Sequence, residues 1–171
     1  MTTSHNNGVT QNATGSVIRA NTDANGAETQ GLSVNATLSA DGTKVVFQSD
    51  AANLVDGDNN ALADIFVKDL TWGTVTRINT SNTGAEANAG GNPIDPPTGS
   101  PIIPILSADG SKVAFVSVAT NLVDGDNNDW ADVFVKDLNT GVITRASTNA
   151  AGEEGNDESY YASLSADGSK V

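Results

Sequence analysis

Two short acidic stretches hold the residues most suited to chemistry in this chain. The first spans residues 53–64 and has Asp, Asp, Asn and Asp at relative positions 1, 3, 5 and 9, counted from Asp56. The second repeats this pattern from Asp124, 68 residues later. Oxygen side chains on alternate residues of a tight loop can converge on one point, which is the arrangement that a hard cation such as Ca²⁺ prefers. The spacing therefore predicts a calcium site in each loop.

The predicted ligands are side-chain oxygens at positions 1, 3, 5 and 9 and a backbone carbonyl at position 7. They are Asp56, Asp58, Asn60, Leu62 and Asp64 in the first loop, and Asp124, Asp126, Asn128, Trp130 and Asp132 in the second. Water can complete a shell of about six to eight oxygens. Neither loop has the Gly at position 6 or the Glu at position 12 of an EF-hand. A solvated turn is the alternative, because Asp, Asn and Gly are turn formers in their own right.

Internal repeats determine which elements position these loops. Residues 38–45, Leu-Ser-Ala-Asp-Gly-Thr-Lys-Val, recur with little change at 106–113 and 164–171. A second marker is an Arg followed by Gly seven residues later and Glu nine residues later, starting at Arg19, Arg77 and Arg145. The shifts of 58 and 68 residues predict a unit of 58 residues, with a ten-residue insertion in the proline-rich stretch 90–100.

Each unit is predicted to form four short strands. In the first complete unit they span residues 34–39, 44–49, 64–70 and 75–79, and Asp41-Gly42 is a strong signal for a hairpin between the first two. The apolar runs 45–47 and 65–67 do not alternate with polar residues, so both faces of the sheet should be covered. The fold class is therefore predicted as all-β, with the four-stranded antiparallel blades of a β-propeller. A β-sandwich is the competitor, but it does not explain a repeat of four strands.

The repeats also predict the domain organisation. Residues 1–15 are expected to be disordered, and 16–171 to form a propeller segment with a blade at 32–80, a linker at 81–100, a blade at 101–148 and a partial blade at 149–171. Residues 17–21 and 143–147 are read as last strands of blades. Because two blades cannot close a ring, we expect either a segment of a larger propeller or assembly with other copies.

The motifs resemble a known repeat. The run from Leu-Ser-Ala-Asp-Gly-x-Lys-Val through Asp-x-Phe-Val-Lys-Asp-Leu to the Thr-Arg strand is similar to the TolB-type propeller repeat of bacterial proteins, in a longer variant with an Asn-Leu-Val-x-Gly-Asp loop. The acidic loop also resembles the calcium loop of integrin-type propeller repeats. The resemblance implies a propeller in an exported protein. It implies no single activity, since such repeats occur in scaffolds, in surface proteins and beside peptidase domains.

Composition restricts the partners. The formal charge of the 171 residues is −13, from 21 acidic and 8 basic side chains, so the surface should repel nucleic acid and anionic lipid. No run of apolar residues is long enough to insert in a membrane. The chain has no Cys, and its single histidine, His5, lies in the segment expected to be disordered, so a Ser-His-Asp triad lacks its base. We therefore expect no enzyme.

These observations lead to one expected function and two alternatives. The first is a non-catalytic, calcium-binding propeller segment of a secreted, surface or periplasmic bacterial protein, acting as a scaffold, adhesion or interaction module. Its partner would be protein, either other copies or the remainder of a longer propeller. The alternatives are the propeller domain of a larger hydrolase of the peptidase type, and a propeller that binds glycans.

Overall fold

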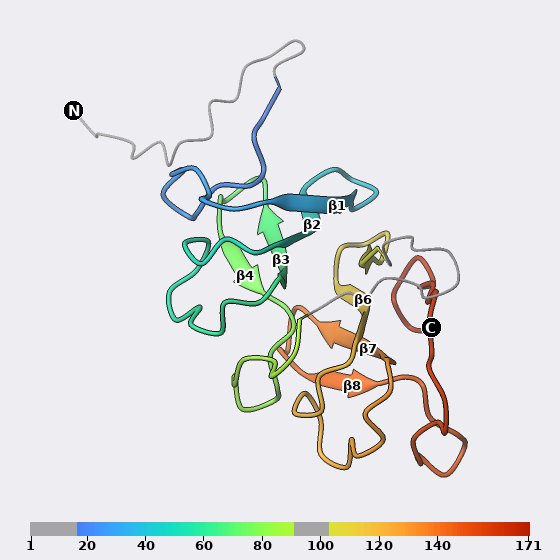
Figure 1. Cartoon of the computed structure of the whole chain (residues 1–171). Coiled ribbons are helices and arrows are strands. Elements are labelled where there is room, and N and C mark those ends of the chain that lie inside the picture. Colours follow the sequence, from blue (N-terminus) through green and yellow to red (C-terminus); the bar gives the residue numbers. More distant parts are fainter. Residues whose placement is uncertain (1–16, 91–102) are drawn as a thin grey trace, which may run out of the picture.

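The computed structural model describes residues 17–90 and 103–171, which form two four-stranded antiparallel sheets with the strands in chain order. The two sheets lie side by side, the first drawn in blue and green and the second in yellow and orange (Figure 1). The strands of the first sheet are β1 (Ser33–Leu38), β2 (Lys44–Ser49), β3 (Asp64–Asp69) and β4 (Val75–Arg77). Those of the second are β5 (Ile105–Leu106), β6 (Lys112–Ser117), β7 (Asp132–Asp137) and β8 (Ile143–Arg145). The predicted all-β fold with two complete four-stranded propeller blades is confirmed.

The central strands are covered on both faces. Val46 belongs to a core that also contains residues of the second sheet. Its neighbours Val45 and Phe47 point to the opposite face and pack in a separate cluster with Phe66. This is the arrangement that the uninterrupted apolar runs predicted, since a strand with one wet face would alternate.

The Asp-Gly hairpins join one blade to the next. Gly42 has a φ of 69°, which a residue with a side chain rarely adopts, and the Asp41 carboxylate accepts hydrogen bonds from the Ser39 hydroxyl and the Thr43 amide. The Ala40 amide then donates to the carbonyl of Ala108 in the next hairpin, at 3.1 Å. The third hairpin is connected in the same way, through the Asp109 amide and the Ala166 carbonyl, at 3.1 Å.

Strand boundaries differ from the prediction where a pairing partner is missing. The prediction of a strand over residues 17–21 is wrong. Among the described residues the first strand begins at Ser33, and the bridge between Thr22 and Glu28 is an isolated one. The corresponding strand β4 is held by β3, and no strand of the described residues stands in that place beside residues 17–21. β4 and β8 also end two residues earlier than expected.

Some predictions fall on residues that are not described. These are the segment 1–15, expected to be disordered, and nearly all of the insertion at 90–100. Within residues 17–90 and 103–171, no helix has the length and apolar character needed to cross a membrane.

Candidate cation site

Each acidic loop is anchored at its start and turned sharply before its end. Leu54 and Leu122 are buried and hold the beginning of the two loops in the core. Four residues within the loops have positive φ angles, Gly57 and Gly125 at 78°, Ala61 at 56° and Asp129 at 58°. Ala61 and Asp129 occupy position 6, so the chain adopts the backbone turn of a cation loop there without glycine.

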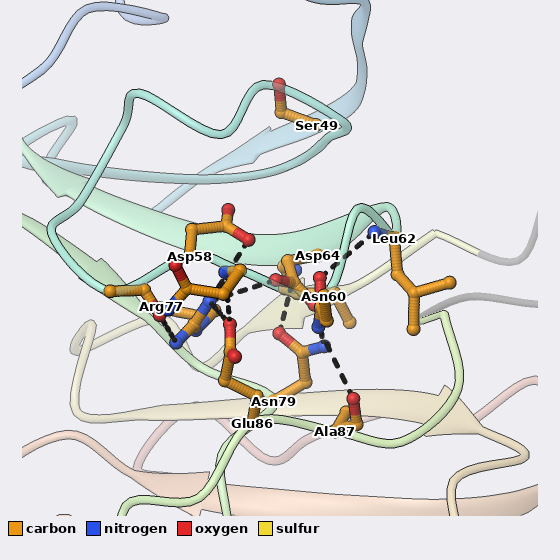
Figure 2. Close-up of polar contacts among 12 residues, drawn as sticks. Ser49, Asp58, Asn60, Leu62, Asp64, Arg77, Asn79, Glu86 and Ala87 are labelled. Carbon is orange, nitrogen blue, oxygen red and sulfur yellow. Dashed lines mark hydrogen bonds and ion pairs between the residues drawn. The ribbon is translucent and has the colours of Figure 1, made fainter.

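In the first loop the acids of positions 3 and 9 surround an arginine (Figure 2). Nη1 of Arg77, at the end of β4, lies 3.3 Å from Oδ1 of Asp58 and 3.3 Å from Oδ2 of Asp64. The other terminal nitrogen, Nη2, donates to the Gly57 carbonyl at 3.2 Å. The side chains of Asp58 and Asp64 are only 3% and 0% exposed, so this is a buried charge cluster.

A third carboxylate comes from outside the loop. Oε1 of Glu86 lies 2.6 Å from Nη1 of Arg77 and accepts a hydrogen bond from the Asn59 amide at 3.0 Å. One carboxylate oxygen each from Asp58, Asp64 and Glu86 lies within 4.8 Å of the other two. Glu86 was not among the predicted ligands, although the sequence held a signal for it. The recurring Arg-Gly-Glu spacing, read only as a repeat marker, is the spacing of this ion pair.

The second loop is built in the same way. Nη1 of Arg145 lies 3.4 Å from Asp126, 3.5 Å from Asp132 and 2.9 Å from Glu154. Oε2 of Glu154 accepts from the Asn127 amide at 3.1 Å, as Glu86 does from Asn59. The repeated geometry shows that the Arg and Glu of each unit belong to its acidic loop.

The position 9 acids are held by a side chain that follows the last strand. Asn79 donates to Oδ1 of Asp64 at 2.6 Å and accepts from the Ile65 amide at 3.0 Å. In the second loop Ser147 donates to Oδ1 of Asp132 at 2.5 Å. In each case one carboxylate oxygen is fixed and the other, Oδ2, is turned toward the arginine.

The predicted ligands are only partly brought together. Asp58 and Asp64 meet, as do Asp126 and Asp132, whereas the position 1 acids Asp56 and Asp124 are exposed.

Positions 5 and 7 hold the loop itself. The side-chain oxygen of Asn60 accepts from the Leu62 amide at 3.0 Å, and its nitrogen donates to the Ala87 carbonyl at 3.3 Å. Asn128 makes the matching bonds to the Trp130 amide and the Gly155 carbonyl. Both Asn side chains therefore tie the loop to the segment that carries Glu86 or Glu154.

The charges in each cluster do not balance. In the first, three carboxylates and one guanidinium give −3 + 1 = −2 when all are ionised. Burial raises the pKa of Asp58, and the charge of Asp64 raises it further. The hydrogen bond from the Asn59 amide, together with Arg77, lowers the pKa of Glu86. Asp58 is therefore the group that gains most from a further positive charge or a proton.

Some buried carboxylate oxygens of the two clusters also lack hydrogen bonds. Among the described residues, Oδ1 of Asp58, Oδ1 of Asp126 and Oδ2 of Asp132 are buried and accept no hydrogen bond. A buried carboxylate oxygen left in this way is costly, and a bound cation would satisfy it. Nε of Arg77 and Nε of Arg145 are also buried without a hydrogen-bond partner, so each cluster contains unsatisfied groups of both signs.

The third copy of the Arg-Glu pair is at the surface. Nη1 of Arg19 lies 2.6 Å from Oε1 of Glu28, with the two side chains 56% and 72% exposed. In the two complete blades the corresponding arginines are 9% and 7% exposed. The acidic loop of the same blade is what buries the arginine.

Among known proteins, similarity was found to solved structures only. No protein-family model matches the sequence, and no curated protein matches it. The crystal structure of the tricorn protease aligns with a TM-score of 0.45 and 18% identity over 81% of this chain. TolB from Acinetobacter baumannii aligns with a TM-score of 0.21 and 22% identity over 68% of this chain. The chain spans 10% of the tricorn protease chain and 32% of the TolB chain.

Proposed function

We propose that this chain is a calcium-binding β-propeller segment of an exported bacterial protein, and that it serves as a non-catalytic scaffold or interaction module. The observation that carries the proposal is the buried Oδ1 of Asp58. It accepts no hydrogen bond and lies beside two further carboxylates, Asp64 and Glu86. In the second loop Asp126, Asp132 and Glu154 likewise contact one arginine, but among the described residues a group of three carboxylates within 4.8 Å of one another is found in the first loop only.

Arginine alone does not neutralise either cluster. One guanidinium opposes three carboxylates, and uncompensated charge in a buried site costs several kcal/mol per ion, on the order of 3–5 kcal/mol when a partner is missing. A divalent cation would bring the first cluster to −2 + 2 = 0, as counted from its ion pairs. Ca²⁺ suits the ligands because they are all oxygens, and because the exposed Asp56 and Asp124 or water could complete the shell.

The role of the ion would be mechanical. Asp58 comes from the loop between β2 and β3, Asp64 from β3 itself, and Glu86 from the segment that leads to the next blade. The Glu86 carbonyl also accepts a hydrogen bond from Asn121, at the start of the second acidic loop, at 2.8 Å. An ion at each site would therefore fasten a long loop to its blade and to the connection between blades.

The non-catalytic part of the proposal rests on the inventory of residues. The chain has no Cys and one His, His5, and the carboxylates that gather in the described residues are those paired with arginine. The exported location is proposed from the resemblance of the repeats to TolB-type repeats, and the protein partner from the two blades, which are too few to close a ring.

The test is thermal unfolding in excess EDTA and then in calcium up to the millimolar range, with magnesium as the control. Extracellular calcium modules bind at roughly 10⁻⁴ to 10⁻³ M, so the melting temperature should climb in that range. The double variant Asp58→Ala, Asp126→Ala should lose the climb. A melting temperature that does not respond to calcium would refute the proposal and leave the loops as turns closed by arginine.

A further inference from the structure

Glu86 gives its carboxylate to the first cluster, but its backbone is held by the second blade. Nδ2 of Asn121 donates to the Glu86 carbonyl at 2.8 Å, and Oδ1 of Asn121 accepts from the Asn88 amide at 3.0 Å. The Asn88 side chain donates to the Thr120 hydroxyl at 2.9 Å and accepts from the Thr120 amide at 3.0 Å. Four hydrogen bonds therefore dock residues 86–88 on the start of the second acidic loop.

This docking point belongs to the core that the two sheets share. Leu122 follows Asn121 in the chain and is buried in that core. Ala87 follows Glu86 and is buried in the same core. Because core residues flank both partners, the hydrogen bonds of Asn121 fix the Glu86 backbone relative to the second blade.

Glu86 is also the carboxylate that most needs such support. Asp58 and Asp64 come from the acidic loop and from β3, and their side chains are 3% and 0% exposed. Glu86 lies on a connecting segment outside the strands, and its side chain is 26% exposed. Its carboxylate nevertheless meets the other two within 4.8 Å. Groups that orient the ligands of a metal commonly change its affinity when they are removed.

The same pair of hydrogen bonds recurs at a place without a carboxylate cluster. Asn53 donates to the Glu28 carbonyl at 3.0 Å and accepts from the Gln30 amide at 3.0 Å. Glu28 is paired with Arg19 at the surface, outside the acidic loops. The asparagine clamp is therefore a repeated feature of the fold, and among the described residues Asn121 is the copy that holds a member of the cluster.

We infer that Asn121 is a positioning residue of the first candidate cation site, and that this site is therefore built by two blades. The inference rests on the proposed function, because it adds a residue outside the ligand set to the same site. Asn121 holds the Glu86 backbone so that its carboxylate lies with those of Asp58 and Asp64. By linkage, a cation bound there would strengthen the docking of residues 86–88 on the second blade.

The experiment compares two asparagine variants of the whole chain in calorimetric titrations with calcium chloride. The binding step that is lost in Asp58→Ala is that of the first loop. Asn121→Ala should weaken this step roughly 10- to 100-fold. Asn53→Ala removes the matching hydrogen bonds beside Glu28 and should leave the step unchanged, since the buried Leu54 still anchors the first loop.

Both asparagines are exposed, so neither substitution opens a cavity in the core. Melting temperatures in EDTA check that the two variants remain folded.

A double-mutant cycle with Glu86 separates positioning from a general loss of stability. Glu86→Ala removes the carboxylate itself, so adding Asn121→Ala should then change the calcium affinity little further. An asparagine with a merely structural role would weaken binding by the same factor in both backgrounds.

The outcomes separate this inference from the proposed function. If the parent chain binds calcium but Asn121→Ala leaves the first step unchanged, the role of Asn121 is overturned while calcium binding stands. The same holds if Asn53→Ala weakens that step equally, or if the effects of Asn121→Ala and Glu86→Ala simply add. If the parent chain shows no calcium response, the proposed function fails and this inference fails with it.

Discussion

Arg77 and Glu86 form a 2.6 Å ion pair that joins the end of β4 to the segment leading into the second blade. The same pair recurs as Arg145 with Glu154 and as Arg19 with Glu28. Among the described residues, the arginine is enclosed by an acidic loop only in the two complete blades. The arginine is therefore a counterion of the acidic loop. The chain also allows a buried arginine–glutamate ion pair to be compared with an exposed copy of the same pair.

Replacing Arg77 by Ala should destabilise the chain strongly in EDTA. The change leaves Asp58, Asp64 and Glu86 without their counterion, and breaking a buried pair in this way costs about 3–5 kcal/mol. Urea unfolding in EDTA measures the loss. Arg19→Ala is the control, because its exposed pair should contribute about 0–1 kcal/mol. Equal losses in the two variants would contradict the role of Arg77.

Calcium should restore much of the stability lost in Arg77→Ala. Without the guanidinium the cluster has a charge of −3, and the cation no longer competes with arginine for the same oxygens. Repeating the urea series in calcium tests this. If the variant is equally unstable with and without calcium, the cluster does not bind the ion.

Replacing Asp58 by Asn should have opposite effects in EDTA and in calcium. The pKa of Asp58 is raised by burial and by Asp64, so its ionised form destabilises the cation-free fold as the pH rises above the pKa of the unfolded chain. At pH 7 in EDTA the neutral Asn should raise the melting temperature, by roughly 2–4 °C per kcal/mol gained. In calcium the order should reverse, because a ligand has been lost. The same order in both conditions would count against a cation at this loop.

The hairpin carboxylates should make the protein sensitive to acid. The Ser39 hydroxyl, with further hydrogen bonds from Thr43, lowers the pKa of Asp41 to about 2. A depressed pKa means that the stability is present above the unfolded value of roughly 3.9 and is lost as the pH falls toward the folded value.

Unfolding measured between pH 4.5 and 2 should therefore show a smaller loss in Asp41→Ala than in the parent chain, since the variant has already lost this contribution. Asp167 lies in the third hairpin, with its pKa also lowered to about 2 by the Ser165 hydroxyl, and Asp167→Ala should behave similarly. An unchanged acid profile in both variants would refute the assignment.

Lys68 should hold the segment before the first blade in place. Its ammonium is buried and donates to the Thr22 hydroxyl, to the Thr22 carbonyl at 2.9 Å and to the Asp23 carbonyl at 3.0 Å. Lys68→Met would leave these acceptors unpaired at a cost of about 1–3 kcal/mol. Hydrogen exchange should then accelerate at the amides of residues 22–30. Lys136, which donates to Thr80, provides the matched test, and its loss should accelerate exchange at residues 80–88 instead.

Much of the fold could be read from local patterns. The observed β2 matches the predicted strand 44–49 because its apolar run, the preceding Asp-Gly turn and the following acidic loop all indicate the same boundaries. The hairpins follow from residues that tolerate positive φ, which is a property of the residues themselves. The strand expected at 17–21 fails because pairing is not local and depends on a neighbour such as β3.

For the site, the sequence by itself determined the spacing of Asp58 and Asp64 and the excess of negative charge. Only the tertiary structure decided that Arg77 and Glu86 enter the cluster, that Asn60 holds the loop through hydrogen bonds, and that Asp56 stays exposed. The reason is physical. Spacing within a loop limits which oxygens can converge. The Arg77 and Glu86 side chains that contact these oxygens come from β4 and from the following segment, so their positions depend on how the whole blade folds.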